Sequence, residues 1–255
     1  MAGGSDGESV LSRVVRILEA FDAESPLLTV TDVSRSTGLP LPTVSRLVCD
    51  MLALGLLQRV DRRRLRIGIR LWELGSRAAP TLGLRDLAMP FMEDLHAAVG
   101  HSVQLAVRRD DSVLFVERLT APGAVYNITK VAGRLPIHVS SAGLVLLAYG
   151  PTHLQQAVLA GPLRRYTAAT PIEPTSLRSL LARVRRSGIA FCPGFVDDRA
   201  TGIAVPLRAN GKQVVAALSV VVPNDSTARA AIPALVAAGH GISRALGAPV
   251  QEVSR

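Results

Sequence analysis

Cysteine, lysine, aromatic residues and long apolar runs are all scarce in this sequence of 255 residues. Its two cysteines, Cys49 and Cys192, stand far apart, which excludes a disulfide framework and a Cys-X-X-Cys metal site. The longest apolar run, residues 214–222 with Ser219 inside it, is far shorter than the roughly 20 residues of a membrane-spanning helix. The first eight residues lack the apolar core of a signal peptide. We therefore expect a cytosolic protein without membrane contact.

Positive charge is carried almost wholly by arginine, because Lys130 and Lys212 are the only lysines. The net charge of +9 favours an anionic partner, since binding such a partner releases counterions. The excess is spread along the chain: residues 1–79 hold 11 basic and 9 acidic side chains, and residues 80–255 hold 18 and 11. Only residues 57–70 are strongly basic locally, with six arginines and a single acid. This cluster says more about function than the total charge does.

The N-terminal part of the chain has the pattern of a helix-turn-helix. Thr29 and Asp32 are spaced like a capping box that opens a helix, and Gly38 can end that helix in the left-handed conformation. Pro42 fits the first position of the next helix, where a missing N–H is harmless. An earlier amphipathic helix, capped by Ser9, is predicted from an apolar stripe made of Val10, Val14, Ile17, Leu18 and Phe21.

A β-hairpin is predicted next, because the short runs 56–60 and 65–69 flank a turn rich in arginine. The helix before it has a small polar outer face that suits the major groove of DNA. There, Arg46 can bind a phosphate or the O6 and N7 atoms of guanine, while the hairpin arginines suit phosphates or the minor groove. The predicted DNA-binding residues are Arg35, Thr43, Ser45, Arg46, Arg62, Arg63, Arg64 and Arg66. In the alternative, a small-molecule sensor module uses the helix-turn-helix for protein contacts.

The rest of the chain predicts an α+β domain in which antiparallel hairpins and helices mix. A helix over residues 69–79 ends before Pro80, and a long helix over 84–99 is expected to kink at Pro90. Asn210-Gly211 is the strongest hairpin turn, because both residues tolerate positive φ. The further predicted strands are 103–108, 113–118, 126–131, 189–195 and 202–207, and the further helices are 140–149, 152–160, 174–187 and 225–246.

Four phrases, in this order and spacing, resemble the IclR family of bacterial transcriptional regulators. They are TGLPLPTVSRL at 37–47 with LGLL and LRIG after it, GRLPIH at 133–138, SSAG at 140–143 with LLA after it, and GIA at 188–190 followed by AVP at 204–206. The resemblance implies an N-terminal winged helix-turn-helix (1–69) joined by a linker helix (70–82) to a GAF-like α/β effector-binding domain (83–255). It also implies a homodimer or homotetramer that binds palindromic operator DNA and responds to a small metabolite.

The resemblance further implies which residues contact the effector. The positions that match the family's pattern are Ser141, Ala142, Cys192, Gly202, Ser219 and Val221. Several of these replace an acid, a cysteine or a serine of the family's pattern with a smaller or less polar group, and Leu144 stands where a lysine is usual. We therefore expect a roomier and less polar pocket, suited to an organic acid or an aromatic metabolite rather than a very small keto acid.

Enzyme chemistry has little support in the sequence. A nucleophilic cysteine needs a base in reach and a lowered pKa, and none of the five histidines lies in a recognisable catalytic motif near Cys192. His96 and His101 are five residues apart, which is wrong for two metal ligands on one helix face, and His138 fits a structural hydrogen bond better. Trp72 fits packing or dimerisation. We expect no enzyme activity, no catalytic residue, no metal and no cofactor.

Overall fold

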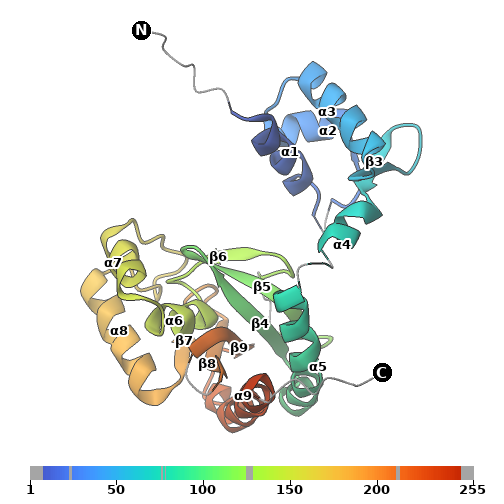
Figure 1. Cartoon of the computed structure of the whole chain (residues 1–255). Coiled ribbons are helices and arrows are strands. Elements are labelled where there is room, and N and C mark those ends of the chain that lie inside the picture. Colours follow the sequence, from blue (N-terminus) through green and yellow to red (C-terminus); the bar gives the residue numbers. More distant parts are fainter. Residues whose placement is uncertain are drawn as a thin grey trace. The chain divides into compact units, whose positions relative to one another are not determined.

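The computed structural model describes residues 8–22, 25–75, 77, 79–124, 129–210 and 213–247. Contacts divide the chain into two compact units, Met1–Ala79 and Pro80–Arg255 (Figure 1). Two predicted features lie partly outside the described residues. These are the start of the expected strand 126–131, and Gly211 of the Asn210-Gly211 turn, whose Asn210 has the expected positive φ of 48°.

Three described helices of the first unit come before its hairpin, and the start of α1 and both ends of α2 follow the predicted capping signals. They are α1 (Val10–Glu19), α2 (Val30–Thr37) and α3 (Leu41–Ala53). The Thr29 hydroxyl and the Asp32 carboxylate each accept the other's backbone N–H, which completes the capping box. The Thr29 hydroxyl also donates to the Asp32 carboxylate at 2.7 Å, and this bond, followed by that from the Thr29 backbone N–H, holds the pKa of Asp32 below its usual value. Gly38 ends α2 with φ +67°. Pro42 is the second residue of α3 rather than the first.

A small sheet completes this unit and holds the predicted hairpin. Its strands are β1 (Leu28–Thr29), β2 (Leu57–Arg59) and β3 (Arg64–Ile67), arranged antiparallel in the order β1-β3-β2. The hairpin prediction is confirmed, whereas strand β1 was not predicted. The side chains that form the core of the unit are Ile17, Val33, Leu39, Val44, Leu47, Val48, Met51, Leu57 and Leu65. This core fixes which face of α3 is buried.

Helices α4 (Ile69–Gly75) and α5 (Ala79–Val99) follow the small sheet. Helix α4 ends before Pro80 as expected, although at Gly75 rather than at 79. Pro80 is the second residue of α5, where a proline needs no backbone hydrogen bond. The long helix therefore begins five residues earlier than the expected 84 and continues through Pro90.

The second unit is built on one six-stranded antiparallel sheet in the order β6-β5-β4-β9-β8-β7. Its strands are β4 (Ser102–Arg109), β5 (Ser112–Leu119), β6 (Arg134–Pro136), β7 (Ala190–Pro193), β8 (Ala200–Ala209) and β9 (Gln213–Pro223). The four predictions at 103–108, 113–118, 189–195 and 202–207 are confirmed. A strand was also predicted over 126–131, but its described part is not a strand, and the strand that follows β5 is β6.

Helices cover both faces of this sheet. They are α6 (Ser141–Ala148), α7 (Thr152–Ala160), α8 (Pro174–Ser187) and, after the 3-10 turn η1 (Ala228–Ala231), α9 (Ile232–Gly247). The helix expected over 225–246 therefore begins at Ile232, seven residues later than predicted. Side chains of α6 and α8 share one core with one sheet face, and those of α5 and α9 share a second core with the other.

Strand alternation decides what each sheet face presents. Small side chains such as Ala106, Ala204 and Ala217 face α6, while larger ones such as Ile203 and Leu218 face α5 and α9. The small side chains let α6 pack closely against this face of the sheet. No helix in the described part of the chain is both long and apolar enough to cross a membrane.

Candidate DNA-binding surface and effector pocket

Helix α3 presents one buried face and one exposed polar face. Val44, Leu47, Val48 and Met51 are buried in the core, which turns Ser45 and Arg46 outward; Thr43, near the helix start, is half-buried. The Arg46 guanidinium forms no ion pair or hydrogen bond with any other residue that the structure describes, so it is available to a phosphate or a base edge.

The hairpin turn is held by a single carboxylate. One oxygen of Asp61 accepts the backbone N–H groups of Arg63 and Arg64 at 2.9 Å each, and the other accepts the Arg64 Nε–H at 2.6 Å. The Arg63 backbone N–H is the largest of the causes that lower the pKa of Asp61 to about 2. Asp61 therefore stays ionised at neutral pH and keeps the exposed arginines at the tip in place.

Two further arginines are oriented by neighbours. Arg66 on β3 donates through Nε and Nη2 to the Gln58 side-chain oxygen of β2 at 3.0 and 2.8 Å, and the two residues are register partners on the hairpin. Arg35 lies 3.4 Å from Asp32, with most of its side chain exposed. Of the eight residues predicted to bind DNA, all but Thr43 are exposed.

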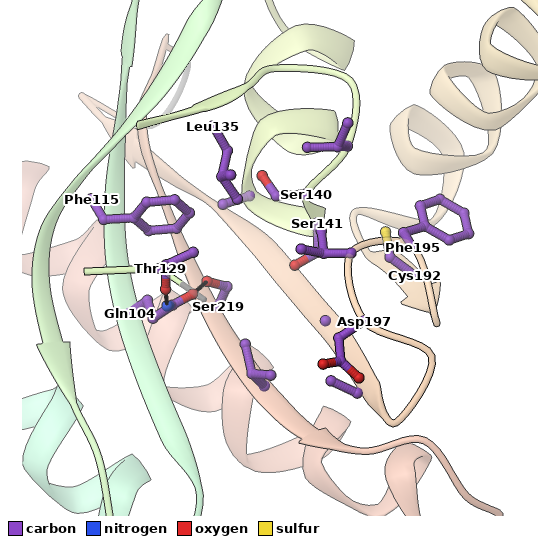
Figure 2. Close-up of a pocket in the computed structure, with 16 residues that line it drawn as sticks. Gln104, Phe115, Thr129, Leu135, Ser140, Ser141, Cys192, Phe195, Asp197 and Ser219 are labelled. Carbon is purple, nitrogen blue, oxygen red and sulfur yellow. Dashed lines mark hydrogen bonds between the residues drawn. The ribbon is translucent and has the colours of Figure 1, made fainter. Parts of the chain in front are cut away.

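The six residues predicted to contact an effector line one pocket in the second unit (Figure 2). Gly202, Ser219, Val221 and Cys192 lie on strands β7, β8 and β9, on the sheet face toward α6, and Ser141 and Ala142 begin that helix. The pocket holds about 490 Å³ of space, counting its opening to solvent. The lining, mainly apolar with a few polar side chains, is typical of a site for a small organic molecule.

One end of the pocket suits an anion. The Ser140 hydroxyl caps α6 by accepting the Gly143 N–H at 3.1 Å. The neighbouring Ser141 hydroxyl has no hydrogen-bond partner among the described residues and points into the pocket in Figure 2. Unpaired N–H groups and the helix dipole favour negative charge at a helix start.

A second cluster of polar side chains lines the pocket away from the start of α6. The Ser219 hydroxyl donates to the Gln104 side-chain oxygen at 3.4 Å, and the Gln104 amide donates to the Thr129 hydroxyl. Figure 2 shows these three side chains beside Phe115. The other walls are largely apolar and include Leu135, Val139, Val196 and Val221. The pocket can therefore hydrogen-bond both ends of a flat apolar molecule.

Two family models match this chain. "IclR helix-turn-helix domain" matches residues 10–61, and "Bacterial transcriptional regulator IclR C-terminal" matches residues 77–247. The chain belongs to the IclR family. It is thus a ligand-responsive transcriptional regulator rather than an enzyme, and the family resemblance and fold class expected from the sequence are confirmed.

Its relatives include named regulators and a solved complex. The Escherichia coli regulator XynR is 26% identical over 94% of this chain and 97% of its own length. The Pca regulon regulatory protein of Pseudomonas putida is 26% identical over 86% of this chain and 75% of its own. An IclR homolog from Microbacterium hydrocarbonoxydans, crystallised with 4-hydroxybenzoate, is 42% identical, covers 93% and 99% of the two chains and has a TM-score of 0.88.

Several pocket residues of this IclR-family chain were not predicted. Gln104 and Phe115 come from β4 and β5, far from the family signatures, and Thr129 and Asp197 come from loops. Asp197 forms two hydrogen bonds to the Arg199 guanidinium, at 3.1 and 2.9 Å, and these bonds lower its pKa. An acidic side chain therefore lines the pocket.

The remaining candidates for chemistry have structural roles. Burial raises the pKa of the Cys192 thiol far above its usual value, so the thiol stays protonated. His138 is buried, and its Nε2 lies 3.1 Å from the Arg164 carbonyl oxygen. His96 contacts the His101 backbone oxygen rather than its ring. No group of metal-ligating side chains is found in the part of the IclR-family chain that the structure describes.

Proposed function

We propose that this regulator binds a palindromic operator as a homo-oligomer built from dimers, with α3 of each copy in the major groove and the β2–β3 hairpin on the adjacent backbone. The exposed Arg46 and the hairpin arginines, which outnumber the exposed acids Asp50 and Asp61 beside them, support DNA rather than protein as the partner. A salt titration tests this: several arginines on phosphates predict a steep fall in affinity with salt, and a flat response would favour a protein partner.

Apolar side chains outside the core support dimerisation of the N-terminal part. Leu11 on α1 is 77% exposed, and Ile69 and Trp72 on α4 are 67% and 68% exposed. Exposed apolar groups of this size are costly in water unless a partner covers them. We assign residues 1–69 to DNA binding, 70–82 to the linker that also pairs the copies, and 83–255 to effector binding.

The effector that fits the pocket is a single-ring aromatic carboxylate bearing a hydroxyl group. Its carboxylate would bind at the start of α6 beside Ser141, and its hydroxyl would reach the cluster of Gln104, Thr129 and Ser219. The unpartnered Ser141 hydroxyl at a helix N-terminus carries this assignment. The relative crystallised with 4-hydroxybenzoate binds a molecule of this class.

A hydrogen-bonded chain offers a route from the pocket to α5, the helix that begins at the division between the two units. Arg118 donates to the Thr129 carbonyl oxygen, and the Arg118 backbone N–H donates to Glu117 at 2.8 Å. Arg85 of α5 then pairs with the buried Glu117 at 2.5 Å. An effector that moves Thr129 would bias the position of α5, and such coupling typically amounts to about 1–3 kcal/mol.

Calorimetry with three probes tests the effector class. We expect 4-hydroxybenzoate to bind most tightly, benzoate more weakly because the hydroxyl is missing, and 4-hydroxybenzyl alcohol most weakly because it has no charge for the helix start. Equal binding of the acid and the alcohol would contradict the assignment of an anion to the start of α6.

A further inference from the structure

A second hollow opens along the free edge of β7. It holds about 1250 Å³, counting space open to solvent, and it differs from the effector pocket in being wide and shallow. Strand β7 is the last strand of the sheet, and among the residues that the structure describes it pairs only with β8. The side chains that line the hollow come from α8, β7, the loop after β7 and η1. Its apolar side chains include Leu180, Val184, Ile189 and Phe191.

Positive charge surrounds this apolar floor. Arg183 and Arg186 reach it from α8 and Arg229 from η1, and no acidic residue lines it. The Arg229 guanidinium stacks on the Phe191 ring at 4.3 Å. None of the three guanidinium groups has an ion pair with a residue that the structure describes. The hollow therefore attracts a ligand that combines apolar surface with negative charge.

The backbone at this edge offers a free donor and acceptor. The Gly194 N–H donates to the Ala200 carbonyl oxygen at 2.9 Å. In an antiparallel pair every second residue turns its N–H and C=O toward the neighbouring strand, so the register directs the backbone groups of Cys192 and Ala190 toward β8 as well. Phe191 lies between them, and its N–H and C=O therefore point away from β8, toward the outside of the sheet. Among the described residues, neither group has another partner.

The two ends of the edge are closed to further pairing. The Ser187 hydroxyl accepts the Ile189 N–H at 3.2 Å and donates to the Ile189 oxygen at 3.0 Å. Pro193 has no N–H to donate. Only Phe191 can exchange two backbone hydrogen bonds with an added strand, so the open segment suits a short peptide rather than another long sheet.

We infer that the β7 edge binds a short extended acidic peptide of a partner protein. One peptide residue exchanges both backbone hydrogen bonds with Phe191. Because successive side chains of a strand point to opposite faces, acidic residues on the two faces meet the α8 arginines on one side and Arg229 on the other. A second copy of this edge is a poor occupant, since it would bring six arginines together. Phe195 lines both this hollow and the effector pocket, so the two sites share one side chain.

Fluorescence anisotropy tests this inference with a labelled hexapeptide in which two adjacent glutamates stand between valines, so that one glutamate lies on each face of the added strand. We expect saturable binding that is lost for the matching lysine–valine peptide and for a glutamate–valine peptide with N-methylated backbone. The double variant Arg183→Glu, Arg229→Glu should bind the acidic peptide at least tenfold more weakly. Arg178→Glu, an exposed α8 position outside the hollow, is the matched control and should bind like wild type.

Three results would overturn the inference. They are unchanged peptide binding by the double variant, equal binding of the N-methylated peptide, and competition by free glutamate at the same concentration as the peptide. A change of oligomeric state in the double variant, measured by sedimentation, would instead make the edge a contact between copies. Thermal melting of each variant serves as the folding control and does not depend on which effector the other pocket binds.

Discussion

Replacing Gly202 by alanine should weaken effector binding without touching the DNA-binding surface. Gly202 lies on β8 directly against the start of α6. A Cβ added there would lie 2.9 Å from the Ser141 Oγ and 3.4 Å from the Ser141 Cβ. The first distance is shorter than real Cβ contacts allow, so either the Ser141 hydroxyl rotates or α6 moves. Both changes alter the place that we assign to the effector carboxylate.

The size of the effect follows from the cost of overpacking. Inserting a methyl group into a packed site typically costs about 1–3 kcal/mol. If this strain is released mainly by displacing Ser141, the Kd for 4-hydroxybenzoate rises by about 5- to 150-fold, because each 1.4 kcal/mol is a factor of ten. Affinity for DNA in the absence of effector should stay at the wild-type value, since the DNA-binding residues belong to the other unit.

Titration calorimetry of the wild type, Gly202→Ala and Gly83→Ala provides the assay. Gly83 is the matched control, because a Cβ added in that part of α5 has no atom within 4 Å. Thermal melting of all three proteins separates a loss of fold from a loss of the site. A wild-type Kd for Gly202→Ala would mean that the effector carboxylate does not bind beside Ser141.

Four further changes test the proposed roles of single residues. Arg46→Ala should weaken operator binding by about 1–3 kcal/mol in an electrophoretic shift, as expected for one good base contact. Arg63→Ala should reduce the slope of log K against log salt by about 1 for each phosphate that the protein no longer neutralises, with little change in sequence preference. Gln104→Leu should remove the preference for 4-hydroxybenzoate over benzoate, a difference of about 0.5–1.5 kcal/mol in calorimetry. Burial lowers the pKa of His138 below 6.5, so as the pH falls the unfolded chain protonates this imidazole before the folded chain does, and the free energy of unfolding of the wild type falls below pH 6.5. In urea titrations at pH 7.5 and pH 5.5, His138→Gln should lose less of this free energy between the two pH values.

Local signals predicted much of the fold. The Thr29–Asp32 capping box and Gly38 depend only on neighbouring residues, so the ends of α2 follow from sequence spacing. Strand β1 was missed because it has two residues and exists only by pairing with β3, which is more than thirty residues away. The start of α5 was expected five residues too late, because a proline marks a helix start as readily as a helix end and Pro80 lies at the second position of this helix.

The site was predictable only where a family signature marks it. Ser141 and Gly202 match signature positions, and the structure brings them into contact distance of each other. Gln104 and Phe115 lie on strands without a signature, and they reach the pocket because β4 pairs with β9 in the middle of the sheet. That pairing joins residues more than a hundred positions apart, which no local pattern reports. The Phe191 edge likewise follows from sheet order and not from sequence.

Operator affinity measured with and without 4-hydroxybenzoate tests whether occupation of the α6 pocket changes how α3 and the hairpin bind DNA. The operator is a duplex selected by the protein from a random library, and calorimetry first shows that the pocket is saturated. We predict a change in Kd of about 5- to 150-fold in the wild type, equal to about 1–3 kcal/mol of coupling, and a much smaller change in Gly202→Ala at the same concentration. An unchanged Kd for the wild type with the pocket filled would contradict a regulator switched by this pocket.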